Sequence, residues 1–146
     1  MQTIQFSDYA WPLPDSSNIT SQFGSRTDPI TGKVSSHHNG LDIGAAQGTP
    51  IVSYMAGEIV QAKYDPDGYG YYITVKHSDN CYTLYGHMSA FAKRSGTVEK
   101  GEVIGYVGST GRSTGPHLHF EYRNGPKYSD AINPMLKLGN YKELIN

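Results

Sequence analysis

The sequence has a single cysteine, Cys81, so no disulfide can form within the chain. The fold must therefore be held by its core, and a chain of 146 residues can bury about 68–70% of its unfolded surface in one domain. Cys81 lies six residues from His87, about 20 Å along an extended chain. We therefore interpret it as a small hydrophobe, buried or at the edge of the core, and not as a metal ligand.

Long apolar runs and net charge are also lacking. No stretch approaches 18 apolar residues, so the sequence predicts no membrane span. The formal net charge is −1, and without a basic surface nucleic acid is not an expected partner. Residues 1–8 contain neither a basic segment nor an apolar one, so we do not expect them to form a secretory signal.

Helical periodicity is nearly absent, and short β-forming segments separated by turn residues take its place. The chain is 37% hydrophobic with 17 glycines and 12 tyrosines, which suits short strands joined by tight turns. Only 141–145 hints at a helix. We expect an all-β fold with minor α content, built on an antiparallel sheet with an open groove across it. The expected strands are 51–54, 57–63, 71–77, 82–87 and 117–123, with a hairpin turn at 78–80 and a turn and short strand within 96–104.

Residues 116–121 read Pro-His-Leu-His-Phe-Glu and carry the strongest chemical signal in the chain. Successive side chains of a strand point to opposite faces, so His117 and His119 share one face and two apolar side chains share the other. The Gly- and Ser-rich segment 109–116 leads into this pair, and its glycines let the backbone approach a ligand closely. Two imidazoles over an apolar backing suit a metal site or a proton-transfer site.

A second segment, 38–42 (His-Asn-Gly-Leu-Asp), can add one nitrogen and one oxygen ligand. Two histidines and a carboxylate, with a fourth position left for water, form a catalytic zinc pattern. His37 competes with His38, but in an extended chain only residues 38, 40 and 42 share a face. His87 ends another strand-like run, within Tyr-Gly-His-Met at 85–88. His77 ends a strand before a turn, so we interpret it as structural.

These motifs together resemble the M23 peptidases, the lysostaphin- and LytM-type zinc metallopeptidases that cut peptide bonds in bacterial peptidoglycan. Three patterns occur in the family's order: H-x-x-x-D at 38–42, Y-G-H-M at 85–88 and S-T-G-P-H-L-H-F-E at 113–121. The resemblance divides the chain into an N-terminal extension (1–10), a peptidase domain (11–136) and a C-terminal tail (137–146).

The resemblance implies one Zn²⁺ per chain, bound by His38, Asp42 and His119. It also implies His87 and His117 as a catalytic pair around a metal-activated water. Zinc lowers the pKa of bound water to about 7 and polarises a scissile carbonyl. Imidazole titrates near neutral pH, so we assign His117 as the general base and His87 as the group that orients water or stabilises developing charge.

The predicted activity is hydrolysis of peptide bonds in peptidoglycan, through a groove open at both ends because a cross-linked polymer cannot thread into a closed pocket. Glycyl-glycine cutters of this kind carry Ala and Gln where this chain has Gly115 and Glu121, which favours stem-peptide or cross-link cleavage. Glu121 shares the face of the histidine pair and is either a group that orients an imidazole or a surface carboxylate. The tyrosine that lysostaphin-type enzymes use has no counterpart in 28–36. We expect a monomer that acts outside the cell or at the cell wall, as a mature fragment or a phage lysin.

Two other interpretations are less favoured. The D-Ala-D-Ala peptidases have a similar site but carry a longer H-to-D interval and a catalytic Glu. Domains of the same fold that have lost their ligands serve as non-catalytic peptidoglycan-binding or hydrolase-activator modules. This chain keeps all five implied site positions, which favours the enzyme.

Overall fold

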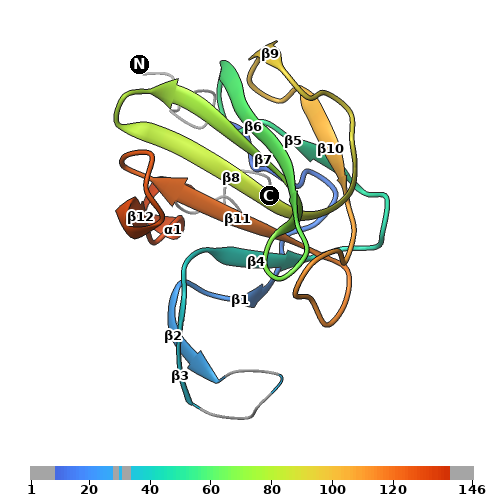
Figure 1. The fold of residues 1–146 in the computed structure, drawn as a ribbon, viewed down its shortest axis with the longest axis vertical. Coiled ribbons are helices and arrows are strands. Elements are labelled where there is room, and N and C mark those ends of the chain that lie inside the picture. The colour runs from blue at the N-terminus through green and yellow to red at the C-terminus, as the bar shows by residue number, and fades with distance from the viewer. Residues whose placement is uncertain (1–8, 28–29, 31–33, 139–146) are drawn as a thin grey trace, which may run out of the picture.

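An antiparallel sheet forms the centre of the protein, as the computed structural model shows for residues 9–27, 30 and 34–138 (Figure 1). Among these residues, one sheet of ten strands has the order β1-β4-β11-β8-β7-β6-β9, with β10 joining β8 to β5 and β12 pairing with β11. A separate pair, β2 and β3, projects below it. The strands are β1 (Asn18–Ser21), β2 (Gly24–Thr27), β3 (Val34–His38), β4 (Leu41–Gly44), β5 (Pro50–Val52), β6 (Gly57–Asp65), β7 (Gly70–Ser78), β8 (Cys81–Phe91), β9 (Gly96–Val98), β10 (Val103–Val107), β11 (His117–Arg123) and β12 (Ala131–Ile132).

The all-β prediction is confirmed. Helical structure in the described part of the chain amounts to a 3-10 turn, η2 (Tyr128–Asp130), and one α-helical turn, α1 (Met135–Leu138). The five predicted strands correspond to β5, β6, β7, β8 and β11, and the predicted hairpin joins β7 to β8. No helix among the described residues is long and apolar enough to cross a membrane.

Several elements differ from the prediction. The segment 96–104 contains two strands, β9 and the start of β10, and not one. Strand β8 does not end at His87 but continues to Phe91. His87 has a positive φ, and the register between β7 and β8 shifts beside it, so that pairing resumes at Met88. The strands β1 to β4 and β12 were not predicted, and the helical hint at 141–145 lies outside the described residues.

The two faces of β11 separate the core from the polar side of the sheet. Leu118 and Phe120 are fully buried in the core, together with Tyr85 of β8. Cys81 is buried in the same cluster, as expected. The core consists of Trp11, Leu13, Leu41, Ile43, Ile51, Tyr54, Ile59, Ile73, Val75, Cys81, Tyr85, Met88, Val98, Ile104, Val107, Leu118, Phe120, Tyr122 and Leu138.

The limits of the peptidase domain at residues 11 and 136 stay a prediction.

Candidate active site

The sheet register brings together candidate residues that are far apart in the sequence. His119 of β11 lies directly opposite Asp42 of β4 on one side and Gly86 of β8 on the other. Directly opposed residues in an antiparallel pair have Cβ atoms about 4.5–5.5 Å apart. The neighbouring strands therefore place Asp42 on one flank of His119 and His87, which follows Gly86, on the other.

His38 reaches the same point from the end of β3. The chain does not form one continuous strand through 38–42, because β3 ends at His38 and β4 begins at Leu41. The condition under which residues 38, 40 and 42 share a face is therefore not met. Gly40 lies in the break between them. A Cβ on Gly40 would lie 2.5 Å from the carbonyl oxygen of Phe120 and 3.0 Å from Cε1 of His119, so a residue without a side chain is needed there.

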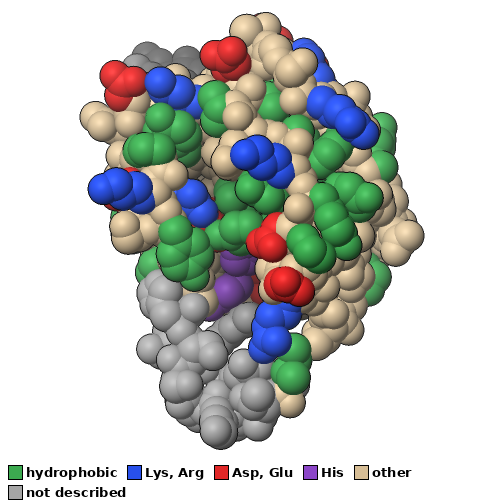
Figure 2. All heavy atoms as spheres, in the orientation of Figure 1, with side chains coloured by type: hydrophobic (Ala, Val, Ile, Leu, Met, Phe, Trp, Pro, Cys, Tyr) green, Lys and Arg blue, Asp and Glu red, His purple; other side chains and the backbone are tan. Residues whose placement is uncertain are grey.

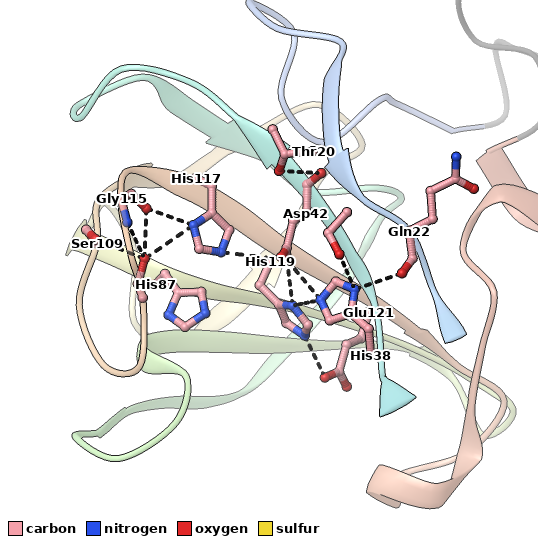
Figure 3. A network of polar contacts seen from close by, with 12 residues as sticks. Thr20, Gln22, His38, Asp42, His87, Ser109, Gly115, His117, His119 and Glu121 are labelled. Carbon is pink, nitrogen blue, oxygen red and sulfur yellow. Dashed lines mark hydrogen bonds and ion pairs between the residues drawn. The ribbon is translucent and has the colours of Figure 1, made fainter. Parts of the chain in front are cut away.

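Three side-chain atoms meet at this point (Figure 3). Oδ1 of Asp42 lies 3.1 Å from Nε2 of His38 and 2.9 Å from Nδ1 of His119, and the two nitrogens are 3.2 Å apart. Ligands about 2.0–2.1 Å from zinc in a tetrahedral site are about 3.3 Å from one another. The triangle therefore has about the size of one face of such a site. Among the described residues, these three form the one group of His, Cys and acidic side chains that could hold a metal ion.

The other nitrogen of each ring shows which atom is free to bind a metal. Nδ1 of His38 lies 3.0 Å from the carbonyl oxygen of Gln22, which can only accept, so Nδ1 carries the proton. Nε2 of His119 donates to a carboxylate oxygen of Glu121 at 2.9 Å. The neutral rings then direct two nitrogen lone pairs at the point that the Asp42 carboxylate also faces. Three electron-pair donors around one point suit a cation, so these residues fit a zinc ion.

The charges within this group depend on one another. Burial would raise the pKa of Asp42, but hydrogen bonds with His119 and His38 outweigh it and hold the pKa well below its usual range. Burial would lower the pKa of His119, but its hydrogen bonds with Asp42 and Glu121 outweigh burial and raise the pKa to about 9. A metal ion would therefore compete with a proton for this ring, as is general for histidine ligands.

His87 and His117 lie beside the triangle without joining it. Their ring centroids are 4.7 Å apart, and Nε2 of His117 is 3.6 Å from Oδ1 of Asp42. Each ring donates from Nδ1 to a backbone carbonyl, His87 to Thr110 at 2.7 Å and His117 to Gly115 at 2.8 Å. In the neutral rings, Nε2 is consequently the atom that can accept a proton.

The backbone of His87 has a φ of 60°, in the left-handed region that residues other than glycine seldom adopt. Its amide donates to the carbonyl oxygen of Tyr69 at 2.6 Å, while its ring is held by Thr110. The Thr110 hydroxyl in turn donates to the carbonyl oxygen of Met88 at 2.6 Å. Burial lowers the pKa of His87 to about 4, so this ring is neutral at neutral pH.

Glu121, Tyr69 and Thr110 are the site residues that sequence reasoning left open or missed. Glu121 has no exposed surface, so its interpretation as a surface carboxylate is wrong. Tyr69 and Thr110 lie in the loops that precede β7 and β11. The second loop was expected to approach a ligand through its glycines, but the contacts of these two side chains were not predicted. His77 contacts the Ala56 carbonyl and the Thr83 hydroxyl away from the groove, as expected for a structural residue. The His37 side chain and most of 28–36 lie outside the described residues.

The site lies at the floor of a groove of about 960 Å³. Figure 2 shows histidine side chains at the bottom of a hollow in the surface. Its lining includes residues 20–22 and Asn39 as well as residues 112–116. All five predicted site residues lie on its lining, while the prediction that the groove is open at both ends stays a prediction.

Fold and site together define the class: an all-β protein with a His-Asp-His group that can hold a metal ion, and two further histidines beside it in a groove. Residues 36–134 match the family model of peptidase family M23, and the chain belongs to this family.

Relatives and solved structures agree with this assignment. The DD-carboxypeptidase/endopeptidase Mpg of Neisseria meningitidis is 46% identical over 120 residues, which are 80% of this chain and 26% of Mpg. The peptidoglycan DD-endopeptidase ShyA of Vibrio cholerae is 35% identical over 121 residues, 82% of this chain and 28% of ShyA. The catalytic domain of lysostaphin from Staphylococcus simulans has a TM-score of 0.76 at 33% identity, covering 86% of this chain and 94% of that domain. The chain thus spans about a quarter of these curated relatives but matches nearly all of the lysostaphin catalytic domain.

Proposed function

We propose that this chain is a zinc metalloendopeptidase that hydrolyses peptide bonds in bacterial peptidoglycan. The observation that carries the proposal is the triangle of His38, Asp42 and His119. The outer nitrogen of each ring is hydrogen-bonded to an oxygen that accepts, so the neutral rings direct their lone pairs at one point. Membership of peptidase family M23 supports the reaction class. Relatives named for DD-endopeptidase activity support peptidoglycan as the substrate.

Zinc held by His38, Asp42 and His119 would supply Lewis acidity for a substrate carbonyl and lower the pKa of a bound water to about 7. His117 is the proposed general base. Its Nδ1 donates a hydrogen bond to the carbonyl oxygen of Gly115, which leaves Nε2 to accept a proton, and Nε2 lies only 3.6 Å from Oδ1 of Asp42. A proton taken up at that nitrogen can be returned to the leaving amine.

His87 has a different proposed role. Its low pKa keeps the ring neutral, and Nδ1 donates a hydrogen bond to the carbonyl oxygen of Thr110. Nε2 is then an acceptor, which favours the orientation of a water molecule in the groove over the donation of a proton to developing negative charge. Its ring lies 4.7 Å from that of His117, measured between the centroids.

The proposed substrate is a stem peptide or a direct cross-link and not a pentaglycine bridge. Gly115 and Glu121 both depart from the pattern of the glycyl-glycine cutters, and the relatives Mpg and ShyA are named for DD bonds. The proposed location is the cell wall or the extracellular space, where this polymer is found, and the proposed state is a monomer with one zinc ion.

The test combines metal analysis with product analysis. The purified protein should contain one zinc ion per chain and should release peptide fragments from directly cross-linked peptidoglycan, detected by mass spectrometry. Chelation should abolish the release, and stoichiometric zinc should restore it. Activity that persists without bound metal would refute the zinc mechanism. A zinc-loaded protein that binds peptidoglycan but cleaves neither directly cross-linked nor glycine-bridged material would identify a binding module instead.

A further inference from the structure

Glu121 lies fully buried behind His119, and its carboxylate is surrounded by donors. Oε2 accepts hydrogen bonds from Nε2 of His119 at 2.9 Å and from the Tyr69 hydroxyl at 2.5 Å. Oε1 accepts from Nε of Arg123 at 2.8 Å and is paired with Nη2 of the same residue at 2.7 Å. A buried carboxylate is costly unless it is paired and hydrogen-bonded, and this two-point contact with Arg123 meets that requirement.

The partners of Glu121 are fixed in turn. Nη1 of Arg123 donates to the Pro126 carbonyl at 3.2 Å, and Nη2 donates to the Tyr69 hydroxyl at 3.1 Å. The guanidinium group also lies over the ring of Tyr128, 5.8 Å from its centroid. The carboxylate therefore cannot rotate away from His119 without breaking several other contacts.

We propose that Glu121, held by Arg123 and Tyr69, is a positioning residue for His119. By accepting a hydrogen bond from the N–H group at Nε2, it sets the orientation of the ring and leaves the Nδ1 lone pair directed toward the point that Asp42 also faces. This inference rests on the proposed zinc site, because His119 is positioned for that ion. Outer partners of this kind raise the basicity of a ligand histidine and fix its tautomer.

Tyr69 connects this carboxylate to the other half of the site. Its hydroxyl donates to Glu121, while its backbone carbonyl accepts from the amide of His87 at 2.6 Å. Its ring lies 5.6 Å from the ring of His119. A change from Tyr69 to Phe would remove the hydroxyl alone and leave the contacts of the backbone and the ring.

Metal affinity is the direct measurement, made by competition with a chromophoric chelator at a temperature where circular dichroism shows each variant folded. Glu121→Gln replaces an acceptor oxygen with an amide nitrogen, which cannot accept from Arg123. It should weaken zinc binding about 10- to 100-fold. Tyr69→Phe should weaken it less, by about fivefold, as for one hydrogen bond. Glu102→Gln is the matched control, since Glu102 pairs with Lys93 away from the groove and should leave zinc affinity unchanged.

The cobalt-substituted protein supplies a second readout, because its visible absorption depends on ligand geometry. Glu121→Gln should change this spectrum and Glu102→Gln should not. Zinc affinity within twofold of the unmutated protein, with an unchanged cobalt spectrum, would overturn the positioning role while leaving the zinc site intact. Failure of the unmutated protein to bind zinc would overturn the proposed function as well. Should Glu121→Gln not fold, unchanged zinc affinity in Tyr69→Phe would overturn the inference.

Discussion

His117 and His119 lie two positions apart on one strand, yet only the replacement of His119 by alanine should weaken metal binding. His119→Ala removes a nitrogen that lies 2.9 Å from Oδ1 of Asp42 and 3.2 Å from Nε2 of His38. It also leaves the buried Glu121 without one of its donors. Nε2 of His117 lies 3.6 Å from Asp42, outside the triangle, so His117→Ala leaves all three proposed ligands in place.

The magnitudes follow from these positions. Loss of an outer partner of a metal ligand costs about 10- to 100-fold in affinity, so loss of the ligand His119 should cost more than about 100-fold. His117→Ala should leave zinc affinity unchanged. Removal of a positioned acid–base group lowers turnover by about 10²–10⁴-fold. This loss corresponds to about 3–5 kcal/mol in the activation barrier.

The two effects are measured separately. Zinc affinity comes from chelator competition, and kcat is measured at saturating zinc with a cross-linked peptide fragment of peptidoglycan as substrate. His87→Ala should behave like His117→Ala, with zinc retained and turnover lost. A His117→Ala protein that loses zinc as completely as His119→Ala would show that the division between ligands and catalytic groups is wrong.

Three further predictions concern the surroundings of the site. His37→Ala should keep both zinc and most of the activity, whereas equal loss in His37→Ala and His38→Ala would refute the choice of His38. Gly40→Ala should weaken zinc binding and lower the free energy of unfolding in urea by about 1–3 kcal/mol, because the new Cβ would meet the backbone of β11; an unchanged denaturation midpoint would contradict this. Burial lowers the pKa of His77, so the unfolded state takes up more protons below about pH 6.5, and stability should fall as the pH falls through this range. His77→Gln should show a shallower pH dependence of the unfolding free energy. An identical slope in the variant and the unmutated protein would refute a contribution of His77 to this pH dependence.

Alternation along a strand is a local property, and the sequence was therefore sufficient to predict it. His117 and His119 had to share a face opposite Leu118 and Phe120, because the side-chain period of a strand is two residues. Other local features predicted more of the fold: the turn residues at 78–80 predicted the hairpin between β7 and β8, and short β-forming segments predicted the all-β class. The ligand set and the catalytic pair came from motif order, as a resemblance, and their roles stay proposals.

Pairing between distant strands is not a local property. The register that sets His119 opposite Asp42 and beside Gly86 joins β4, β11 and β8, and no local pattern specifies which of these strands are neighbours. The break at Gly40 likewise depends on the close approach of β11, which no local pattern specifies.

Glu121 shows the difference most clearly. Strand alternation placed its carboxylate on the face of the histidine pair, but could not distinguish a solvated acid from a buried one. Its burial depends on Tyr69, 52 positions earlier in the chain, and on Arg123, whose guanidinium is held by groups beyond the end of β11. The sequence alone determined which side chains share a face. Only the tertiary structure decided which of them are removed from water and what they touch, because burial and hydrogen bonding depend on segments that fold against one another from far along the chain.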